Sequence, residues 1–195
     1  ATTGFGVDVM ISRSGYTGED GYEISVPGHA AERIWNTLLE DERVRPIGLG
    51  ARDSLRLEAG LPLYGHDVDE TVSPVEAGLT FAVSKKRRDA QDFPGAARIV
   101  KELAEGPARV RVGLKVLGGP PAREGAEIAD TAGKVVGVVT SGGFAPSLGA
   151  PIAMGFVPPA LSAVGTKLNV IVRGRAGAAE VVAMPFVPNR YIRKV

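Results

Sequence analysis

Residues 13–26 read RSGYTGEDGYEISV, and this stretch decides how the first half of the chain folds. Three glycines and an acidic pair separate two segments of alternating apolar residues, 7–11 and 22–26. Alternation of this kind is typical of a strand with one buried face, and glycine-rich segments between strands form turns. The stretch therefore predicts a hairpin with a long tip loop.

The second strand of this hairpin carries a carboxylate in its middle. Because side chains alternate across a strand, Tyr22, Ile24 and Val26 share one face, while Glu23 and Ser25 share the other. A glutamate at such a position either lies on a solvated outer face or meets a cationic or donor-rich partner. The pattern alone favours the solvated face and leaves the second interpretation open.

Composition excludes several kinds of site. The 195 residues are 44% hydrophobic and 23% charged, as in ordinary soluble globular proteins, and can form one large domain or two small ones. The formal charge of +1 gives no basic footprint for nucleic acid, and no apolar run is long enough to span a membrane. With no cysteine and only two histidines, no metal site is predicted.

Two helices are predicted after the hairpin. Apolar residues recur with helical spacing over residues 31–39, and we expect Trp35 to anchor the core. The second helix spans about residues 51–59, with an apolar line through Ala51 and Leu55. Arg52 lies in its first turn, where the helix dipole disfavours a cation. Arg52 is therefore either solvated or placed for a ligand that carries acceptors.

The next segment is predicted to be mostly irregular. Asp67, Asp69 and Glu70 lack the spacing of a calcium loop, so a solvated acidic turn is expected instead of a metal site. Residues 79–83 look like a strand. The basic run 85–88 is expected to be a solvated loop, with docking of an acidic partner as the minority interpretation.

The sequence pattern changes from helical segments to short strands at residues 104–107, after a short helix predicted at 96–103. Short strands split by glycine and proline turns, including turns at 118–121 and 141–143, predict a small closed or sandwiched β domain. Tyr191 and Arg193, on the tail after Pro188, can reach back to the first part of the chain. The predicted strands are 109–116, 135–140, 152–157, 167–173 and 181–186.

No catalytic motif stands out from the residues alone. There is no GxSxG, no phosphate-binding loop and no dinucleotide fingerprint, and neither histidine lies near a nucleophile motif. The residues by themselves predict a two-part α+β protein with a candidate carboxylate and arginine pair, Glu23 and Arg52.

Several motifs resemble those of the glycine cleavage system T-protein, or aminomethyltransferase, family and occur in the family's order. Together they cover nearly the whole chain and resemble the C-terminal half of the family's longer chains. The motifs are GYTGEDGYE (15–23), GLGARDSLRLEAGL (48–61), LYG (63–65), DFPG (92–95), TSG (140–142) and MPFVP (184–188).

The resemblance implies an α+β fold in two parts. Residues 1–104 would form the C-terminal part of the family's folate-binding α/β region. Residues 108–195 would form its C-terminal β-barrel or jelly-roll-like domain. An exposed apolar face is then expected where the missing N-terminal half packs.

The resemblance also implies a tetrahydrofolate site without a metal. The family's folate-contacting glutamate and arginine match Glu23 and Arg52, and two pocket tyrosines match Tyr16 and Tyr191. A carboxylate can accept from the pterin N–H and amino donors, and a guanidinium suits carbonyl or carboxylate oxygens. The family's catalytic aspartate matches no residue here, because it belongs to the missing half. We therefore expect no catalytic residue in this chain and no turnover by it alone.

The implied reaction belongs to glycine catabolism. It takes the aminomethyl group from the lipoyl arm of the carrier H-protein, releases ammonia and leaves 5,10-methylenetetrahydrofolate, chiefly by proximity with electrostatic help. The implied partners are the H-protein and the missing N-terminal half, with neither nucleic acid nor a membrane. The location would be the cytoplasm in a bacterium or the mitochondrial matrix in a eukaryote.

Three alternatives remain open. The same module forms the folate-accepting end of sarcosine and dimethylglycine dehydrogenases, although residues 85–88 and 92–95 look more like a T-protein and no flavin-binding region is present. A related demethylase family passes methyl groups to tetrahydrofolate. A third group binds folate without catalysis and serves iron–sulfur assembly, but its cysteine motif is absent here.

Overall fold

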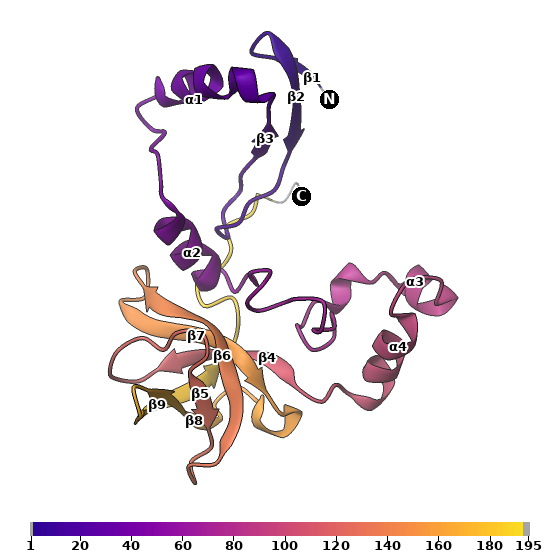
Figure 1. The fold of residues 1–195 in the computed structure, drawn as a ribbon, viewed down its shortest axis with the longest axis vertical. Coiled ribbons are helices and arrows are strands. Elements are labelled where there is room, and N and C mark those ends of the chain that lie inside the picture. Colours follow the sequence, from indigo (N-terminus) through magenta and orange to yellow (C-terminus); the bar gives the residue numbers. More distant parts are fainter. Residues whose placement is uncertain (1, 193–195) are drawn as a thin grey trace.

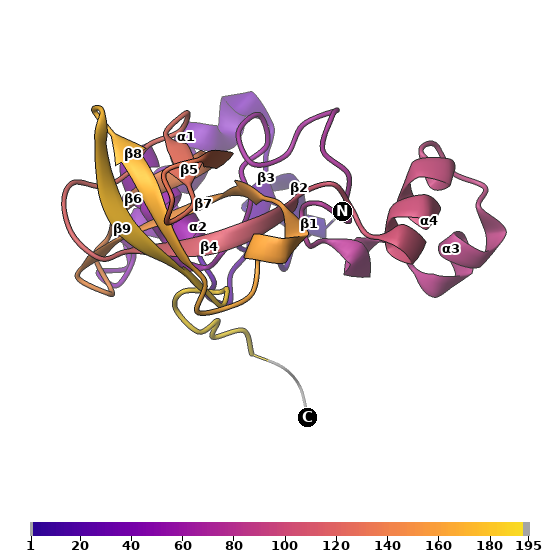
Figure 2. The same cartoon turned by 90° about the horizontal axis from the view of Figure 1, so that it is seen from below.

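The computed structural model describes residues 2–192, so Arg193 lies outside the described part. Three parts follow one another along the chain: a small α/β unit, an arm of two helices, and a β-barrel (Figure 1). Helix α2 (Leu49–Glu58) joins the first part to the barrel, and the arm stands away from the barrel (Figure 2). The predicted division at residues 104–108 stays a prediction.

The α/β unit begins with the hairpin that residues 13–26 predict, and this prediction is confirmed. Three antiparallel strands lie in the order β1-β2-β3, and Ser12 pairs with Glu23 across the tip loop. A short 3-10 helix leads into α1, whose bounds match the predicted helix. These elements are β1 (Thr2–Gly4), β2 (Val7–Ser12), β3 (Glu23–Ser25), η1 (Gly28–Ala30) and α1 (Ala31–Leu39).

The burial of α1 differs from the prediction. Ile34 is buried, but Trp35 is 51% exposed, so the expected core anchor is wrong. A helical apolar stripe identifies the side that would pack, whereas burial also needs an element to cover it. The small sheet of the α/β unit leaves Trp35 and Leu38 uncovered.

Helix α2 packs on the barrel through an unexpected face. Arg56, Leu57 and Glu58 are its buried residues, whereas Ala51 of the predicted apolar line is exposed. Leu57 packs in one cluster with residues of β6 and β7 (Ala145, Ile152, Met154). The charged residues beside Leu57 have hydrogen-bond partners: the Glu58 carboxylate accepts from the Ser147 N–H at 2.9 Å, and the partners of Arg56 are described below.

The arm contains two corrections. The predicted strand at 79–83 has no neighbouring strand to pair with, and part of it forms the 3-10 helix η2 (Thr80–Ala82). The basic run predicted as a loop forms α3 (Lys85–Ala90), because Ser84 caps its first turn by accepting a hydrogen bond from the Arg87 N–H. Helix α4 (Ala96–Glu105) confirms the last helix predicted in this part.

Six antiparallel strands close into a barrel in the order β4-β7-β6-β5-β8-β9, which confirms the closed β domain. Inward-facing residues of these strands, among them Leu114, Val139 and Val170, form its core. The strands are β4 (Val110–Val116), β5 (Glu127–Ala129), β6 (Val135–Ala145), β7 (Ala150–Val157), β8 (Lys167–Val172) and β9 (Arg175–Val182), with η3 (Pro159–Leu161) after β7.

Three strand predictions in the barrel need correction. Strand β5 was not predicted, because three residues are too few for a visible alternation. The turn predicted at 141–143 lies inside β6. The strand predicted at 181–186 overlaps β9 only at residues 181–182, because β9 begins at Arg175, in an alanine-rich segment of weak strand propensity, and ends at Val182.

The chain exposes more surface than a compact protein of its size. Its accessible surface is 12048 Å², whereas a compact monomer of this size exposes about 8,800 Å². The most exposed large apolar side chains lie mostly before the barrel, and include Tyr22, Leu49, Tyr64 and Phe81. Exposed apolar side chains are thus present, and their packing against a further half stays a prediction. Among the described residues, no helix has the length and apolar character needed to cross a membrane.

Candidate functional site

The loop between β2 and β3, residues 13–22, is closed by a bidentate ion pair. The Arg13 Nε and Nη2 atoms donate to the two Asp20 carboxylate oxygens at 3.1 and 2.8 Å. The C-terminal tail runs beside this loop (Figure 1), and the Arg190 N–H donates to the Gly18 carbonyl at 2.7 Å. The tail thus returns to the first part of the chain at residue 190, whereas the reach predicted for Tyr191 itself stays a prediction.

Gly18 allows the loop, the tail and α2 to meet. Its φ is +76°, a conformation that favours glycine. A Cβ atom here would lie 2.9 Å from both the Ala59 Cβ and the Asn189 Oδ1. Only a residue without a side chain fits between these two neighbours, so this glycine fixes the loop against the end of α2.

Tyr16 and Arg52 form a contact between this loop and α2. The Arg52 guanidinium lies over the Tyr16 ring, 4.4 Å from its centroid. The Tyr16 hydroxyl donates to the Pro62 carbonyl. Burial raises the pKa of Tyr16, while Arg56 and Arg52 act in the opposite direction. The phenol therefore stays protonated near neutral pH and keeps its role as a donor.

Arg52 retains donors for a further group. It is exposed, and no ion pair to it is formed by any residue from 2 to 192. Stacking on the Tyr16 ring fixes the guanidinium plane without using its N–H groups. An acceptor-bearing molecule beside this loop can therefore be held by Arg52.

Glu23 begins β3 at the other end of the same loop. It is exposed, and its Oε2 atom accepts a hydrogen bond from the Ser14 hydroxyl. Within residues 2–192 no ion pair joins Glu23 to Arg52, so the structure does not form the direct pair considered from the sequence. The solvated carboxylate keeps its other oxygen for a donor.

Tyr191 follows Arg190 on the returning tail. Its side chain is 37% exposed, and the preceding residue bridges to Glu19 of the loop. All four residues predicted for the site thus lie on the 13–23 segment or on elements in contact with it. Their contact with a ligand stays a prediction.

A buried hydrogen-bond network around Asp67 supports this site, and the sequence analysis missed it. Asp67 is fully buried, and its Oδ2 atom accepts from the Arg56 Nη1 and the Ser141 hydroxyl, each at 2.7 Å. The Thr140 hydroxyl donates to its Oδ1. Asp67 is therefore not part of a solvated turn, and the prediction for this residue is wrong. The network ties α2 and the following loop to strand β6.

Arg56 completes the network. It is 3% exposed, and its Nε and Nη2 atoms also donate to the Asp53 carboxylate at 2.8 and 2.7 Å. A signal was present in the sequence: Arg56 lies between Leu55 and Leu57, and Thr140 and Ser141 bring two hydroxyls into an apolar strand.

Arg111 of β4 fixes the end of α2 in a second way. It donates from Nη1 to the Gly60 carbonyl and from Nε to the Ala77 carbonyl, each at 3.0 Å. Burial lowers the pKa of Arg111, and the Asp67 carboxylate opposes this shift. An arginine remains cationic under such conditions, so Arg111 acts as a permanent donor. In residues 2–192, no three His, Cys, Asp or Glu side chains are grouped so that they could hold a metal.

Comparisons with known proteins match both parts of the chain. The family model described as the GCVT N-terminal domain matches residues 2–87, and the model of the glycine cleavage T-protein C-terminal barrel domain matches residues 109–188.

Curated relatives and a solved structure give the same answer. The chain is 50% identical over 188 residues to a probable mitochondrial aminomethyltransferase of Schizosaccharomyces pombe, covering 96% of this chain and 48% of the relative. It is 55% identical over 192 residues to the mitochondrial aminomethyltransferase of Gallus gallus, covering 98% and 49%. The crystal structure of glycine cleavage system aminomethyltransferase T from Bartonella henselae matches with a TM-score of 0.91 at 48% identity, covering 95% of this chain and 52% of that one. The chain thus spans about half the length of the relatives it matches.

Proposed function

Because the chain belongs to the glycine cleavage T-protein family, we propose that it is the C-terminal half of an aminomethyltransferase that transfers a one-carbon group to tetrahydrofolate. The observation that carries this proposal is the Arg52 guanidinium, which is stacked on Tyr16 and has no ion-pair partner among residues 2–192. A stacked arginine with unused donors suits a ligand that is rich in carbonyl or carboxylate oxygens.

The side chains present fit tetrahydrofolate by the chemistry of their donors and acceptors. Glu23 offers a carboxylate oxygen to the adjacent N–H and amino donors of a pterin ring, and Arg52 offers N–H donors to its acceptors. Tyr16 and Tyr191 add aromatic surface near the same loop. We propose these four as the folate-contacting residues of this chain.

The role we propose for this chain is binding and orientation. The reaction would move an aminomethyl carbon from the lipoyl arm of H-protein to the folate amine, with release of ammonia. This part of the protein would hold the acceptor, while the group that assists proton transfer comes from the other half. Catalysis of this kind relies on proximity and fixed electrostatics.

The partners and the location follow from the same proposal. The exposed apolar side chains of the α/β unit would be covered by a polypeptide equivalent to the N-terminal half of the relatives. H-protein would be a transient partner. The eukaryotic relatives are named mitochondrial, which favours the mitochondrial matrix if this chain comes from a eukaryote and leaves the cytoplasm for a bacterium.

The alternatives are less favoured. The relatives and the solved structure are all named aminomethyltransferase, which favours that activity over a dehydrogenase module, a demethylase or a non-catalytic folate protein.

Arg52→Ala is expected to weaken tetrahydrofolate binding at least about tenfold, which corresponds to about 1.4 kcal/mol. The reason is the loss of a cation without an ion-pair partner among the described residues, because Arg13 and Arg190 at the same loop are paired with Asp20 and Glu19. Isothermal titration of tetrahydrofolate into wild type, Arg52→Ala and Glu23→Gln measures the effect. The matched controls are Arg33→Ala and Glu32→Gln, which remove the same charges from the exposed side of α1.

The same titration needs a second arm, because the chain spans half of its relatives. Joining the chain to the N-terminal half of the Bartonella henselae protein supplies the complementary part of the site. If neither Arg52→Ala nor Glu23→Gln changes the tetrahydrofolate affinity of that fusion, the proposed site is wrong. Ammonia release from aminomethylated H-protein then tests the reaction itself.

Trp35 reports whether a complementary half covers the α/β unit. It is the single tryptophan of the chain and is half exposed. Adding the isolated N-terminal half of the Bartonella henselae protein is expected to shift the Trp35 fluorescence to shorter wavelength. Binding of that half with no change in an emission spectrum corrected for its own tryptophans would mean that it packs elsewhere.

A further inference from the structure

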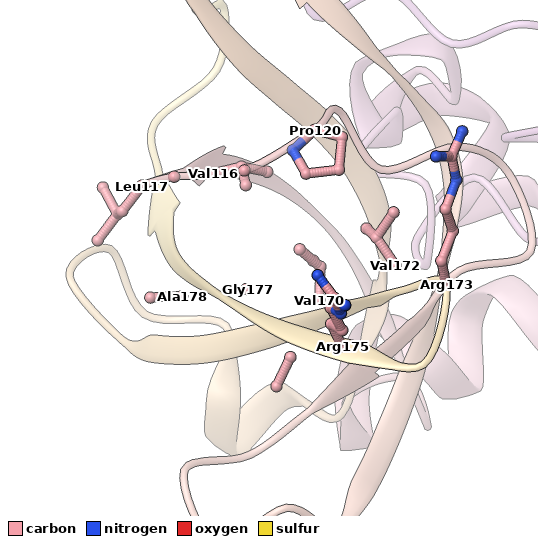
Figure 3. Close-up of a pocket in the computed structure, with 12 residues that line it drawn as sticks. Val116, Leu117, Pro120, Val170, Val172, Arg173, Arg175, Gly177 and Ala178 are labelled. Carbon is pink, nitrogen blue, oxygen red and sulfur yellow. The ribbon is translucent and has the colours of Figure 1, made fainter.

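A cavity of about 700 Å³ lies at one end of the barrel and shares no residue with the candidate folate site. It opens between the loop after β4 and the hairpin formed by β8 and β9 (Figure 3). This volume is in the range of small-molecule sites in proteins. No step of the proposed function uses this cavity.

The walls of the cavity continue the apolar interior of the barrel. Val116 and Val170 are buried members of its core, and Val172 packs against that core. Figure 3 shows Val116 and Pro120 on the loop side of the opening and Val170 and Val172 on the hairpin side. An apolar body that enters here would therefore meet apolar side chains on two sides.

The register of the hairpin of β8 and β9 places Arg175 and Gly177 on the inward face of the sheet. Val170 pairs with Gly177 and Val172 pairs with Arg175, and paired residues of adjacent strands lie on the same face of the sheet. Gly177 contributes no side chain at an inward position, which leaves room. Arg175 brings a guanidinium to the end of the inward row, where the other barrel positions carry apolar residues.

A second arginine occupies the turn of this hairpin. Arg173 and Gly174 have φ values of +52° and +74°, the pattern of a two-residue type I′ turn. Asn, Asp or Gly is preferred at the first of these positions, so an arginine is an unusual choice with a conformational cost. Its guanidinium lies at the rim of the cavity (Figure 3).

The charged side chains that line the cavity are all positive. Its twelve lining residues include Arg173 and Arg175 but no aspartate or glutamate. Neither arginine forms an ion pair with any residue between 2 and 192. Two cations without an ion-pair partner at the mouth of an apolar cavity attract anions to it.

We propose that this cavity binds a small organic anion with an apolar body, whose phosphate or carboxylate is held by Arg173 and Arg175. The guanidinium groups suit either kind of oxyanion, and the valine and proline walls take the apolar part. The cavity shares no residue with the candidate folate site, so this proposal can be tested independently of the proposed function.

Fluorescence titration with 1-naphthyl phosphate and 1-naphthoate tests the site, with 1-naphthol and inorganic phosphate as probes that lack one half of the chemistry. Both anions are expected to saturate one site, and both control probes to bind at least about tenfold more weakly. Arg175→Gln and Arg173→Asn should each weaken anion binding about tenfold, equivalent to about 1.4 kcal/mol. Asparagine is chosen at position 173 because it suits the turn and keeps the hairpin folded.

Gly177→Val tests the apolar part of the cavity. A Cβ atom at this position would lie 3.6 Å from the Gly118 carbonyl oxygen and 3.7 Å from that of Val170, which are ordinary contacts. The variant should therefore fold, as thermal melting can verify, and should weaken binding of both naphthyl anions by filling the space they use.

Arg33→Gln serves as the matched control, because it removes one exposed cation elsewhere. It should not change the affinity for 1-naphthyl phosphate. Loss of binding in Arg52→Gln alone would place the anion at the candidate folate site and overturn the proposal. Equal binding of 1-naphthol would overturn it too, as would no saturable binding. Sedimentation velocity of wild type and Arg175→Gln covers one more outcome. If wild type binds no anion and Arg175→Gln sediments more slowly than wild type, the variant has lost a dimer, and a second copy of the chain fills the cavity instead.

Discussion

Asp67→Ala is expected to lower the free energy of unfolding by about 3–5 kcal/mol, because it leaves a buried arginine without its fully buried carboxylate partner. Arg56 and Asp67 are 3% and 0% exposed, and their charged atoms lie 2.7 Å apart. Removal of the carboxylate also leaves the Ser141 hydroxyl and the Leu63 N–H without an acceptor. Domains are commonly stable by only about 5–15 kcal/mol, so the variant should be close to unfolding at room temperature.

Urea denaturation followed by circular dichroism measures this effect, with Asp69→Ala as the control. Asp69 is exposed and accepts hydrogen bonds from Thr71, so its loss should change stability by less than about 1 kcal/mol. A variant that replaces both partners, Arg56→Met with Asp67→Leu, leaves no unpaired buried charge, because the remaining partner Asp53 is more than half exposed, and should recover part of the lost stability. Equal midpoints for Asp67→Ala and Asp69→Ala would show that the buried pair does not hold the structure together.

Asp67 also shows where prediction from sequence stops. Its partners Arg56, Thr140 and Ser141 lie 11, 73 and 74 residues away along the chain. A carboxylate beside other acidic residues in an irregular segment has the local pattern of a solvated turn, and nothing local reveals that β6 will cover it. The hairpin, α1 and α4 were predictable, by contrast, because each is determined by spacing within its own segment.

Trp35 and Arg52 show the same division between local pattern and tertiary contact. The stripe of α1 predicts which side is apolar, but no sequence pattern in this chain says whether another element covers Trp35. For the candidate site, sequence reasoning identified Arg52 and Glu23 as a candidate pair, which the structure does not form within the described residues. The stacking of Arg52 on Tyr16 depends on the path of a loop that meets α2, which spacing along the chain does not determine.

Gly142→Ala is expected to destabilise the barrel by about 3 kcal/mol, an overpacking effect at the upper end of its usual range. A Cβ atom at residue 142 would lie 2.3 Å from the backbone oxygen of Ala122, so two backbone segments would have to separate. Glycine therefore occurs here because another backbone approaches the strand, and the sequence pattern that predicts a turn is misleading.

The neighbouring glycine provides the matched control for this prediction. A Cβ atom at Gly143 would meet the Arg123 Nη1 at 3.4 Å, and that atom is the end of an exposed, flexible side chain that can move. Gly143→Ala should therefore change the free energy of unfolding by less than about 1 kcal/mol, measured in the same urea titration. The difference between the two variants isolates backbone approach from the general loss of glycine. If both variants lower the free energy of unfolding equally, the close approach of the Ala122 backbone to β6 does not explain why residue 142 is glycine.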